Sequence, residues 1–247
     1  METDWFKFYF DDSYEDYILG EIPEELTEEQ VRLIEDTLDL KSGSKILDLC
    51  CGIGRHSIAL AKKGYNVTAI DYSFSYIEEL KNRAEELSLS INAISMDARE
   101  INFKEEFDAI IIMFVSFGYF NDIENEELLK KLALALKNGG KILIDLENRD
   151  YILKHFIREK WREKDYGLLL ERHKFDPISS RQKTKRIIIL NSGEKKETFR
   201  DIRLYSAHEL IAIANNANLK VDKLYGDYDR TTFHINAPRL LFSFMKN

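Results

Sequence analysis

The sequence predicts a doubly wound α/β fold, with a mostly parallel seven-stranded sheet and a small antiparallel β insertion after the fifth strand. Between about residues 45 and 147, short β-rich runs alternate with helical patterns, which is typical of a parallel sheet covered by helices. Beyond this region, three strand-like runs follow one another directly. The length of 247 residues suits one hydrophobic core with one elaboration.

Composition and charge exclude several classes of protein. Apolar residues make up 44% of the chain, which excludes a disordered or low-complexity scaffold, and the net charge of -8 disfavours a surface that wraps a polyanion. The first residues include Glu2 and Asp4 and no apolar run, so we expect a cytoplasmic protein without membrane contact. Cys50 and Cys51 are adjacent and the histidines are scattered, so no metal site is expected.

The core elements follow from hydrophobic periodicity. One helix is expected to begin at Thr27, with Gln30 completing its cap, and another to begin at Ser75 in a capping box with Glu78. A third helix, rich in leucine, is expected to end at Gly139. The five strands of this region are expected at 45–50, 66–71, 91–96, 107–114 and 141–146.

The remaining elements flank this core. The insertion is expected to contain strands at 167–175, 181–190 and 197–205, and the core to resume with a helix near 207–216 and strands at 220–225 and 239–244. The chain therefore divides into an amino-terminal aromatic arm and capping helix (1–40), a ligand-binding core (41–150), a β lobe that forms an acceptor lid or an oligomer contact (151–206), and a closing segment that completes the sheet (207–247). The rings of the arm either pack on the core or close over a ligand, and both roles are compatible.

The most informative segment is residues 46–71, where a strand leads into a turn containing Gly52 and Gly54 and then into a helix. Glycines allow a ligand to approach the backbone closely, and the helix amino terminus offers unpaired N–H groups. Asp71 ends the next strand, where a carboxylate can accept both hydroxyls of a ribose. The segment therefore predicts an adenosine-containing ligand.

The acid in the first strand narrows the choice of ligand. A dinucleotide site wants a glycine where Ser57 stands, and Asp48 would repel a pyrophosphate. The same carboxylate suits a ligand with an ammonium group, which the amino-acid half of S-adenosylmethionine carries.

Residues Asp48 to Gly54 (DLCCGIG) resemble the first motif of the class I S-adenosylmethionine-dependent methyltransferases, acidic-x-Gly-x-Gly-x-Gly, with Cys50 in place of the first glycine. The resemblance implies a Rossmann-like fold and S-adenosyl-L-methionine as the cofactor, with Asp48 near its methionine part, Asp71 on its ribose and Asp97 on its adenine. The cofactor-binding residues expected on this basis are Asp48, Cys50, Gly52, Gly54, Arg55, Asp71, Tyr72, Met96, Asp97, Ala98, Phe114, Tyr9 and Tyr17.

The segments GRHSIALAKKGY, SFGYF and NRDYI, together with the β insertion, resemble small-molecule methyltransferases of the glycine N-methyltransferase-like kind. In these enzymes the insertion covers the acceptor site, so a small-molecule acceptor is expected near Phe117, Tyr119, Asn148 and Arg149. Methyl transfer from a sulfonium needs alignment rather than a covalent nucleophile. The candidates for a catalytic role are Tyr119, Ser116 and His56, although His56 in a helix first turn also suits a neutral structural histidine. The motifs do not determine whether nitrogen, oxygen or carbon accepts the methyl group.

Two other functions stay open. Residues 151–200 hold 14 Lys and Arg against seven acids, which suits RNA methylation, whereas residues 1–50 hold 15 acids against four basic residues. Arg181, Lys183 and Lys185 alternate with Gln182 and Thr184 as on the exposed face of a strand, where charge also serves solubility. The acidic arm and basic lobe could instead attract one another, within one chain or in a homodimer. The third alternative is a nucleotide-binding protein without catalysis.

Overall fold

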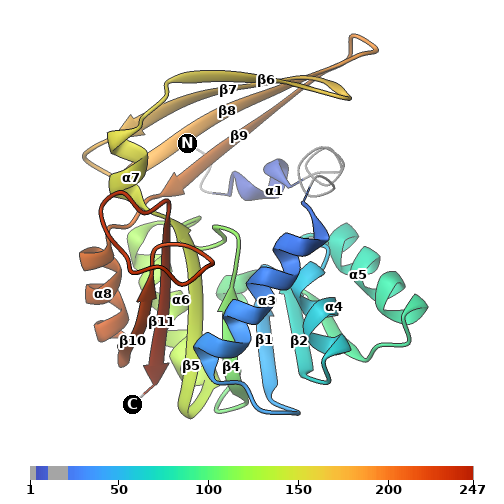
Figure 1. The fold of residues 1–247 in the computed structure, drawn as a ribbon, viewed down its shortest axis with the longest axis vertical. Helices are drawn as coiled ribbons and strands as arrows, with labels where there is room; N and C mark the ends of the chain where they lie inside the picture. The colour runs from blue at the N-terminus through green and yellow to red at the C-terminus, as the bar shows by residue number, and fades with distance from the viewer. Residues whose placement is uncertain (1–3, 11–21, 247) are drawn as a thin grey trace.

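The computed structural model describes residues 4–10 and 22–246 and consists of an α/β core with a separate β sheet above it (Figure 1). The core sheet has seven strands in the order β10-β11-β5-β4-β1-β2-β3, and β11 runs antiparallel to both of its neighbours. This confirms the doubly wound fold and the strand count. The strands are β1 (Lys45–Leu49), β2 (Asn66–Asp71), β3 (Ile91–Ser95), β4 (Phe107–Ile112), β5 (Leu136–Glu147), β10 (Leu219–Tyr225) and β11 (Arg239–Lys246).

Helices cover both faces of this sheet. Helices α3 (Glu24–Leu38), α4 (Arg55–Lys62) and α5 (Phe74–Glu86) cover one face, and α6 (Asp122–Ala135) and α8 (Ala207–Asn216) cover the other. Alternate residues of a strand point to opposite faces, so Ile46 packs with the α3 side and Leu47 with the α6 side. Within the described residues, no helix combines the length and apolarity needed to cross a membrane.

Three expected helix boundaries are wrong. Helix α5 is capped by Ser73, which accepts a hydrogen bond from Tyr76 N–H, rather than by Ser75. Thr27 and Gln30 lie buried inside α3, because their side chains serve as partners of α4 instead of as caps. Helix α6 ends at Ala135, because the next residue turns extended and pairs with Phe107 in the sheet.

The lobe is a four-stranded antiparallel sheet in chain order: β6 (Glu159–Lys164), β7 (Gly167–Asp176), β8 (Arg181–Leu190) and β9 (Lys195–Arg203). A short helix, α7 (Arg149–Lys154), leads into it from β5. Strand β6 was not expected, because its sequence EKWREK has no apolar alternation. Charged residues of this kind are typical of an edge strand, which is where β6 lies.

The described part of the amino-terminal arm, residues 4–10, lies between the lobe and the core. Its helix α1 (Phe6–Tyr9) sits below β9 in Figure 1, and Trp5, Phe6 and Tyr9 are buried there. Arg181 also joins the two parts, because its guanidinium donates to the backbone oxygens of Tyr119 and Phe120 at 3.2 and 2.8 Å. The expectation that Arg181 lies on an exposed face is therefore wrong.

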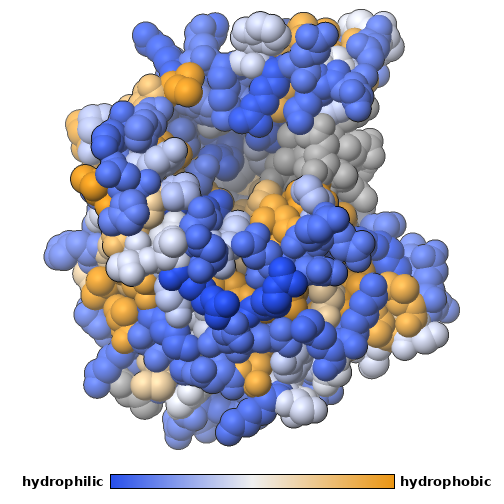
Figure 2. Space-filling model, viewed as in Figure 1, coloured by the Kyte–Doolittle hydropathy of each residue, from blue (hydrophilic) through white to orange (hydrophobic). Residues whose placement is uncertain are grey.

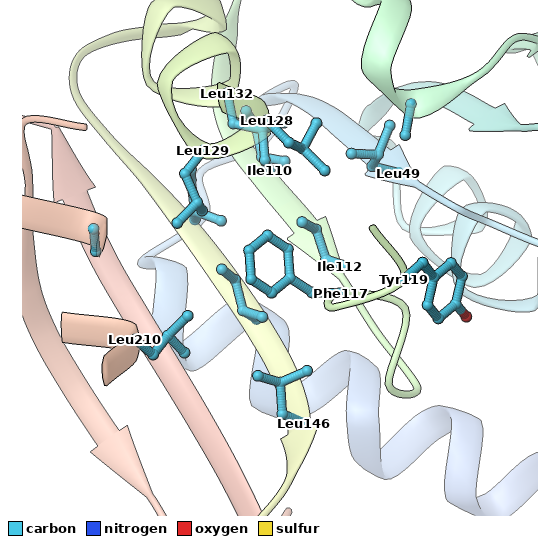
Figure 3. Close-up of a cluster of buried hydrophobic side chains, with 14 of the residues drawn as sticks. Leu49, Ile110, Ile112, Phe117, Tyr119, Leu128, Leu129, Leu132, Leu146 and Leu210 are labelled. Atoms are coloured by element: carbon cyan, nitrogen blue, oxygen red, sulfur yellow. The ribbon is translucent and has the colours of Figure 1, made fainter. Parts of the chain in front are cut away.

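One of the expected acceptor residues, Phe117, packs in the hydrophobic core. Phe117 is 1% exposed, and Figure 3 shows its ring among Ile112, Leu129 and other side chains of the sheet and α6. Tyr119, two residues later, points away from this cluster. The structure therefore assigns Phe117 to the core.

Candidate functional site

A first cavity of about 450 Å³ lies at the carboxyl ends of β1, β2, β3 and β4. Strands β1 and β4 are neighbours here although β2 and β3 lie between them in sequence, and such a point of reversed strand order is where α/β sheets bind ligands. The structure brings ten of the expected cofactor residues to its wall: Asp48, Cys50, Gly52, Arg55, Asp71, Tyr72, Met96, Asp97, Ala98 and Phe114.

The turn after β1 has a left-handed backbone at three positions. Cys50, Gly52 and Gly54 have φ angles of 60°, 57° and 77°. Gly54 precedes α4, and a Cβ atom added to it would lie 2.2 Å from a methyl carbon of Leu80 in α5. Cys50 thus adopts the conformation that a glycine would favour, and Gly54 allows α4 and α5 to pack closely.

Asp48 is the buried acid of this cavity. Its side chain is 1% exposed and accepts a 2.6 Å hydrogen bond from the Ser57 hydroxyl. Burial raises the pKa of Asp48 to about 6, and the hydrogen bond from Ser57 opposes this rise. A cationic ligand beside Asp48 would return its pKa toward the ordinary range, because a positive charge favours the carboxylate.

Asp71 holds the turn after β1 against the end of β2. Its two carboxylate oxygens accept the backbone N–H groups of Gly52 at 2.8 Å and Ser73 at 2.9 Å. Burial raises the pKa of Asp71 above its ordinary value, and these backbone hydrogen bonds offset part of the rise. A carboxylate has about four acceptor positions, so Asp71 has acceptor capacity beyond these two bonds.

Asp97 is held by Arg99, which the sequence reasoning missed. Arg99 donates to Asp97 at 2.7 Å and also contacts Asp4 and Glu124, while its guanidinium lies over the rings of Phe6 and Phe120. Burial alone would raise the pKa of Asp97, but the hydrogen bonds and charge of Arg99 lower it. Asp97 is therefore ionised, and its neighbour Arg99 connects this wall of the cavity to the arm.

The arm contributes to two different places. Phe6 and Phe10 line the first cavity, and Trp5 packs edge-on against Tyr119 with ring centroids 5.0 Å apart. Tyr9 points the other way and lies away from the first cavity, with Arg186 of the lobe over its ring at 5.2 Å. Tyr17 lies outside the described residues.

The three candidate catalytic residues all line the first cavity. The Ser116 hydroxyl donates to the backbone oxygen of Met113, and Tyr119 packs in the aromatic group of the arm. His56 Nε2 lies 2.9 Å from Gln30 Oε1, and burial lowers its pKa well below the usual value. His56 is thus a neutral histidine that fixes α4 to α3, in agreement with the structural alternative.

A second cavity of about 460 Å³ lies between the lobe and the core and shares Phe114 with the first cavity. Figure 2 shows a hollow between the lobe and the core on this side of the molecule. The core contributes Val115, Glu147 and Arg239 to its wall. The lobe contributes alternate residues of its four strands, which we call the inner face of the lobe: Lys160, Arg162, Lys164, Leu169, Glu171, His173, Gln182, Thr184, Arg186 and Arg200.

The shared residue Phe114 is held by a buried acid. Phe114 and Val115 have φ angles of 59° and 64°, and the Phe114 N–H donates to the Asp145 carboxylate at 2.9 Å. Asp145 is fully buried and also accepts hydrogen bonds from Tyr228 and Arg239. Burial and the charge of Asp145 raise the pKa of Tyr228, so its hydroxyl stays a donor. Asp145 therefore stabilises the turn that separates the two cavities.

The other expected acceptor residues do not reach either cavity. Asn148 is 2% exposed, caps α7 and donates to the backbone oxygen of Ala237. Arg149 is ion-paired with Glu209 of α8 at 2.8 Å. With Phe117 in the core, only Tyr119 of the four expected residues lines a cavity.

The inner face of the lobe was missed, although the sequence carries a signal for it. If Lys183 and Lys185 point outward, then the period of two requires Gln182, Thr184 and Arg186 to point inward. The expected exposed face comprised only the outward set. Arg99, Asp145 and Tyr228 carry no comparable local signal, because their partners are distant in sequence.

Comparison with known proteins finds similarity to methyltransferases. A model described as a methyltransferase domain matches residues 46–140. The putative methyltransferase YqeM of Bacillus subtilis is 27% identical over 84% of this chain and 86% of its own length. A glycine/sarcosine N-methyltransferase of Aphanothece halophytica is 28% identical over 50% of this chain, and a demethylmenaquinone methyltransferase of Paenarthrobacter aurescens is 34% identical over 46%. These two matches span only 48% and 42% of the relatives' own lengths.

Solved structures support the fold of the whole chain. The CcbJ methyltransferase of Streptomyces caelestis matches all of the chain with a TM-score of 0.86, and an S-adenosylmethionine-dependent methyltransferase of Clostridium acetobutylicum matches 96% of it with a TM-score of 0.83. Each structure is 16% identical to this chain and is covered over 100% and 97% of its own length. The domain match, the relatives and the shared fold agree with the cavity at the switch point, and together they support a class I S-adenosylmethionine-dependent methyltransferase.

Proposed function

We propose that the protein transfers a methyl group from S-adenosylmethionine, bound in the first cavity, to a small molecule bound in the second cavity. The observation that carries this proposal is that the two cavities share Phe114 as a common wall. Their volumes of about 450 and 460 Å³ are in the range of small-ligand sites. The names of the relatives, which include a glycine/sarcosine and a demethylmenaquinone methyltransferase, also support a small acceptor.

The residues of the first cavity suit S-adenosylmethionine. Asp48 offers a buried acid to an ammonium group, and Asp71 keeps acceptor positions for ribose hydroxyls. Met96 and Ala98 provide apolar contacts on either side of Asp97, beside which an adenine ring would lie. When bound, the cofactor would supply a methyl group activated by a positively charged sulfur.

The protein's own contribution to this reaction is alignment and exclusion of water. The Asp145-anchored turn holds Phe114 between the cavities, and the arm covers the first cavity with Phe6 and Phe10. The lobe closes the second cavity from above. Positioning of two reactants in a dry site accelerates an in-line displacement without a covalent intermediate.

RNA as the acceptor is less well supported. Lys185 is paired with Glu197 at 2.7 Å, and Arg181 is paired with Asp201 and with the backbone of the core. Asp201 and Glu197 therefore offset the positive charges of Arg181 and Lys185, which had suggested RNA binding. An RNA phosphate backbone would have to displace these acids. Tight, salt-sensitive binding of bulk tRNA that is lost on neutralising Arg181, Lys183 and Lys185 would favour RNA instead.

Calorimetric titration with S-adenosylmethionine tests the cofactor assignment. We expect Asp71→Ala to weaken binding by about 10- to 100-fold, since hydrogen bonds to a charged group contribute about 1.5–3 kcal/mol. Asp108→Ala is the matched control, because Asp108 lies at the opposite end of the sheet, paired with Lys137. Equal affinities of wild type and Asp71→Ala would contradict the ribose assignment.

Transfer itself is tested by incubating the protein with methyl-labelled S-adenosylmethionine and the small-molecule fraction of a cell extract. We expect a labelled small-molecule product together with S-adenosylhomocysteine. Binding of the cofactor without any labelled product would instead support the non-catalytic alternative.

A further inference from the structure

His173 lies on the inner face of the lobe, inside the second cavity. Its side chain is 8% exposed, and its Nδ1 lies 2.9 Å from Thr184 Oγ1 on the neighbouring strand. Because Nδ1 is engaged by Thr184, Nε2 is the ring nitrogen available to a molecule in the cavity. The same cavity reaches Phe114, beyond which the methyl donor is proposed to bind.

The other titratable groups of the cavity are poorly suited to accept a proton. Glu171 is ion-paired with both Lys160 and Arg186, and although burial works against it, these charges lower its pKa to about 2. Burial raises the pKa of Tyr9, so its hydroxyl keeps its proton. Glu147 is paired with Arg200, and His155 is exposed. Among the described residues of this wall, His173 is thus the buried titratable group whose neutral form offers a nitrogen lone pair to a proton.

We infer that the acceptor carries a protic nitrogen or oxygen, as an amine or a hydroxyl does, and that His173 is the base that receives its proton. The inference rests on the proposed function. As the lone pair of the acceptor atom forms a bond to the methyl carbon, the carbon–sulfur bond breaks and its electrons go to sulfur. The proton of the acceptor passes to Nε2 of His173 and from there to water, so that charge and atoms balance.

The charges around His173 permit this role. Burial lowers its pKa, so the ring is neutral near pH 7 and can accept a proton. Glu171 and Glu147 favour the imidazolium that forms, whereas Lys160 and Arg200 oppose it. Tyr9 from α1, Arg186 from β8 and Arg239 from β11 also face the cavity. The opposing charges place the proton on His173 only transiently, which allows its release to water.

The test measures methyl transfer from labelled S-adenosylmethionine to the small-molecule fraction of a cell extract, at values from about pH 6 to about pH 9. Mass spectrometry of the wild-type product identifies the methylated atom. His173→Gln keeps an N–H that can donate to Thr184, and His173→Asn is a second variant in case the first is unstable. His208→Gln is the matched control, because His208 is exposed on α8 and lines neither cavity.

We expect a product methylated on nitrogen or oxygen, and a loss of about 100-fold or more in rate at neutral pH for His173→Gln. The remaining rate should rise with pH, because solvent then removes the proton, while the affinity for S-adenosylmethionine stays at the wild-type value. A product methylated on carbon, or a variant with the wild-type rate and pH profile, would overturn the role of His173 and leave the proposed function intact. Absence of any wild-type product would contradict the proposed function, and the inference with it.

Discussion

Asp48 illustrates how one residue can serve binding at the expense of stability. Its side chain is buried and accepts a hydrogen bond from the Ser57 hydroxyl. Burial raises the pKa of Asp48 to about 6. A group with a raised folded-state pKa contributes stability below its unfolded pKa and loses that contribution as the pH rises through the folded value. The ligand-free protein therefore loses stability from Asp48 between about pH 4 and about pH 6.

The first prediction is that S-adenosylmethionine binds about tenfold more weakly at about pH 5 than at about pH 7.5. Protonated Asp48 no longer attracts an ammonium group, and one pH unit below its pKa only about a tenth of the protein carries the carboxylate. Calorimetric titration at both pH values measures this. Asp48→Asn should remove the pH dependence and raise the melting temperature of the ligand-free protein near neutral pH, and a lower melting temperature would contradict the argument.

At the scale of elements, the junction between β1 and α4 depends on a glycine. Gly54 has a φ of 77°, and an added Cβ would meet Leu80 of α5 at 2.2 Å. Gly64 closes the same helix with a φ of 87°, and an added Cβ there would have no neighbour within 4 Å. A substitution at Gly64 therefore tests backbone strain alone, whereas a substitution at Gly54 tests backbone strain together with a packing clash.

The second prediction compares these two glycines. Gly64→Ala should lower the free energy of unfolding by about 1–2 kcal/mol, the cost of a left-handed backbone with a side chain. Gly54→Ala should cost about 1–3 kcal/mol more, because Leu80 must also move. Urea denaturation measures both values. Equal losses would show that Leu80 adjusts without cost.

The turn after β4 is the second critical junction, and the third prediction concerns its anchor. Asp145→Asn should lower the free energy of unfolding by about 3–5 kcal/mol, because the Arg239 guanidinium loses its buried partner. Tyr228→Phe should cost only about 1 kcal/mol, because a single hydrogen bond to Asp145 is lost. Urea denaturation measures the free energy of unfolding of both variants. Similar losses in the two variants would contradict a dominant role of the ion pair between Asp145 and Arg239.

At the scale of the whole molecule, the arm connects parts that are distant in sequence. It lies between the lobe and the core, with Phe6 on the first cavity and Tyr9 on the second. Arg99 joins it to the core through Asp4 and the ring of Phe6. Both cavities therefore depend on the arm being in place.

The fourth prediction is that Arg99→Ala releases the arm. Trp5 is 8% exposed whereas Trp161 is 67% exposed. Because the chain has two tryptophans, the tryptophan fluorescence of a Trp161→Phe background reports on Trp5 of the arm alone. Acrylamide quenching of Trp5 should increase several-fold in Arg99→Ala. Lys130→Ala is the control, because its ion pairs join two glutamates of the same helix. Unchanged quenching in Arg99→Ala would show that ring packing alone holds the arm.

The local parts of the fold were predictable because their signals are local. Strand β2 and helix α8 agree with the expected ranges, since a period of two or of 3.6 is visible within one element. The expected residues on the wall of the first cavity were predictable for a similar reason. They lie at or after the carboxyl ends of parallel strands, and parallel strands end at the same edge of a sheet, whereas Phe6 and Phe10 reach this wall from the arm.

By itself, the sequence determined the α/β class, the strand–turn–helix segment around Asp48 and Gly52, and the acid at the end of β2. Only the tertiary structure decided that Tyr9 faces the second cavity, that Asn148 caps α7 while Arg149 pairs with Glu209 of α8, and that His173 lies on the inner face of the lobe. The physical reason is that periodicity sets which side chains of an element share a face. Which other element covers that face depends on contacts between residues distant in the chain, such as Asp145 with Tyr228 and Arg99 with Asp4.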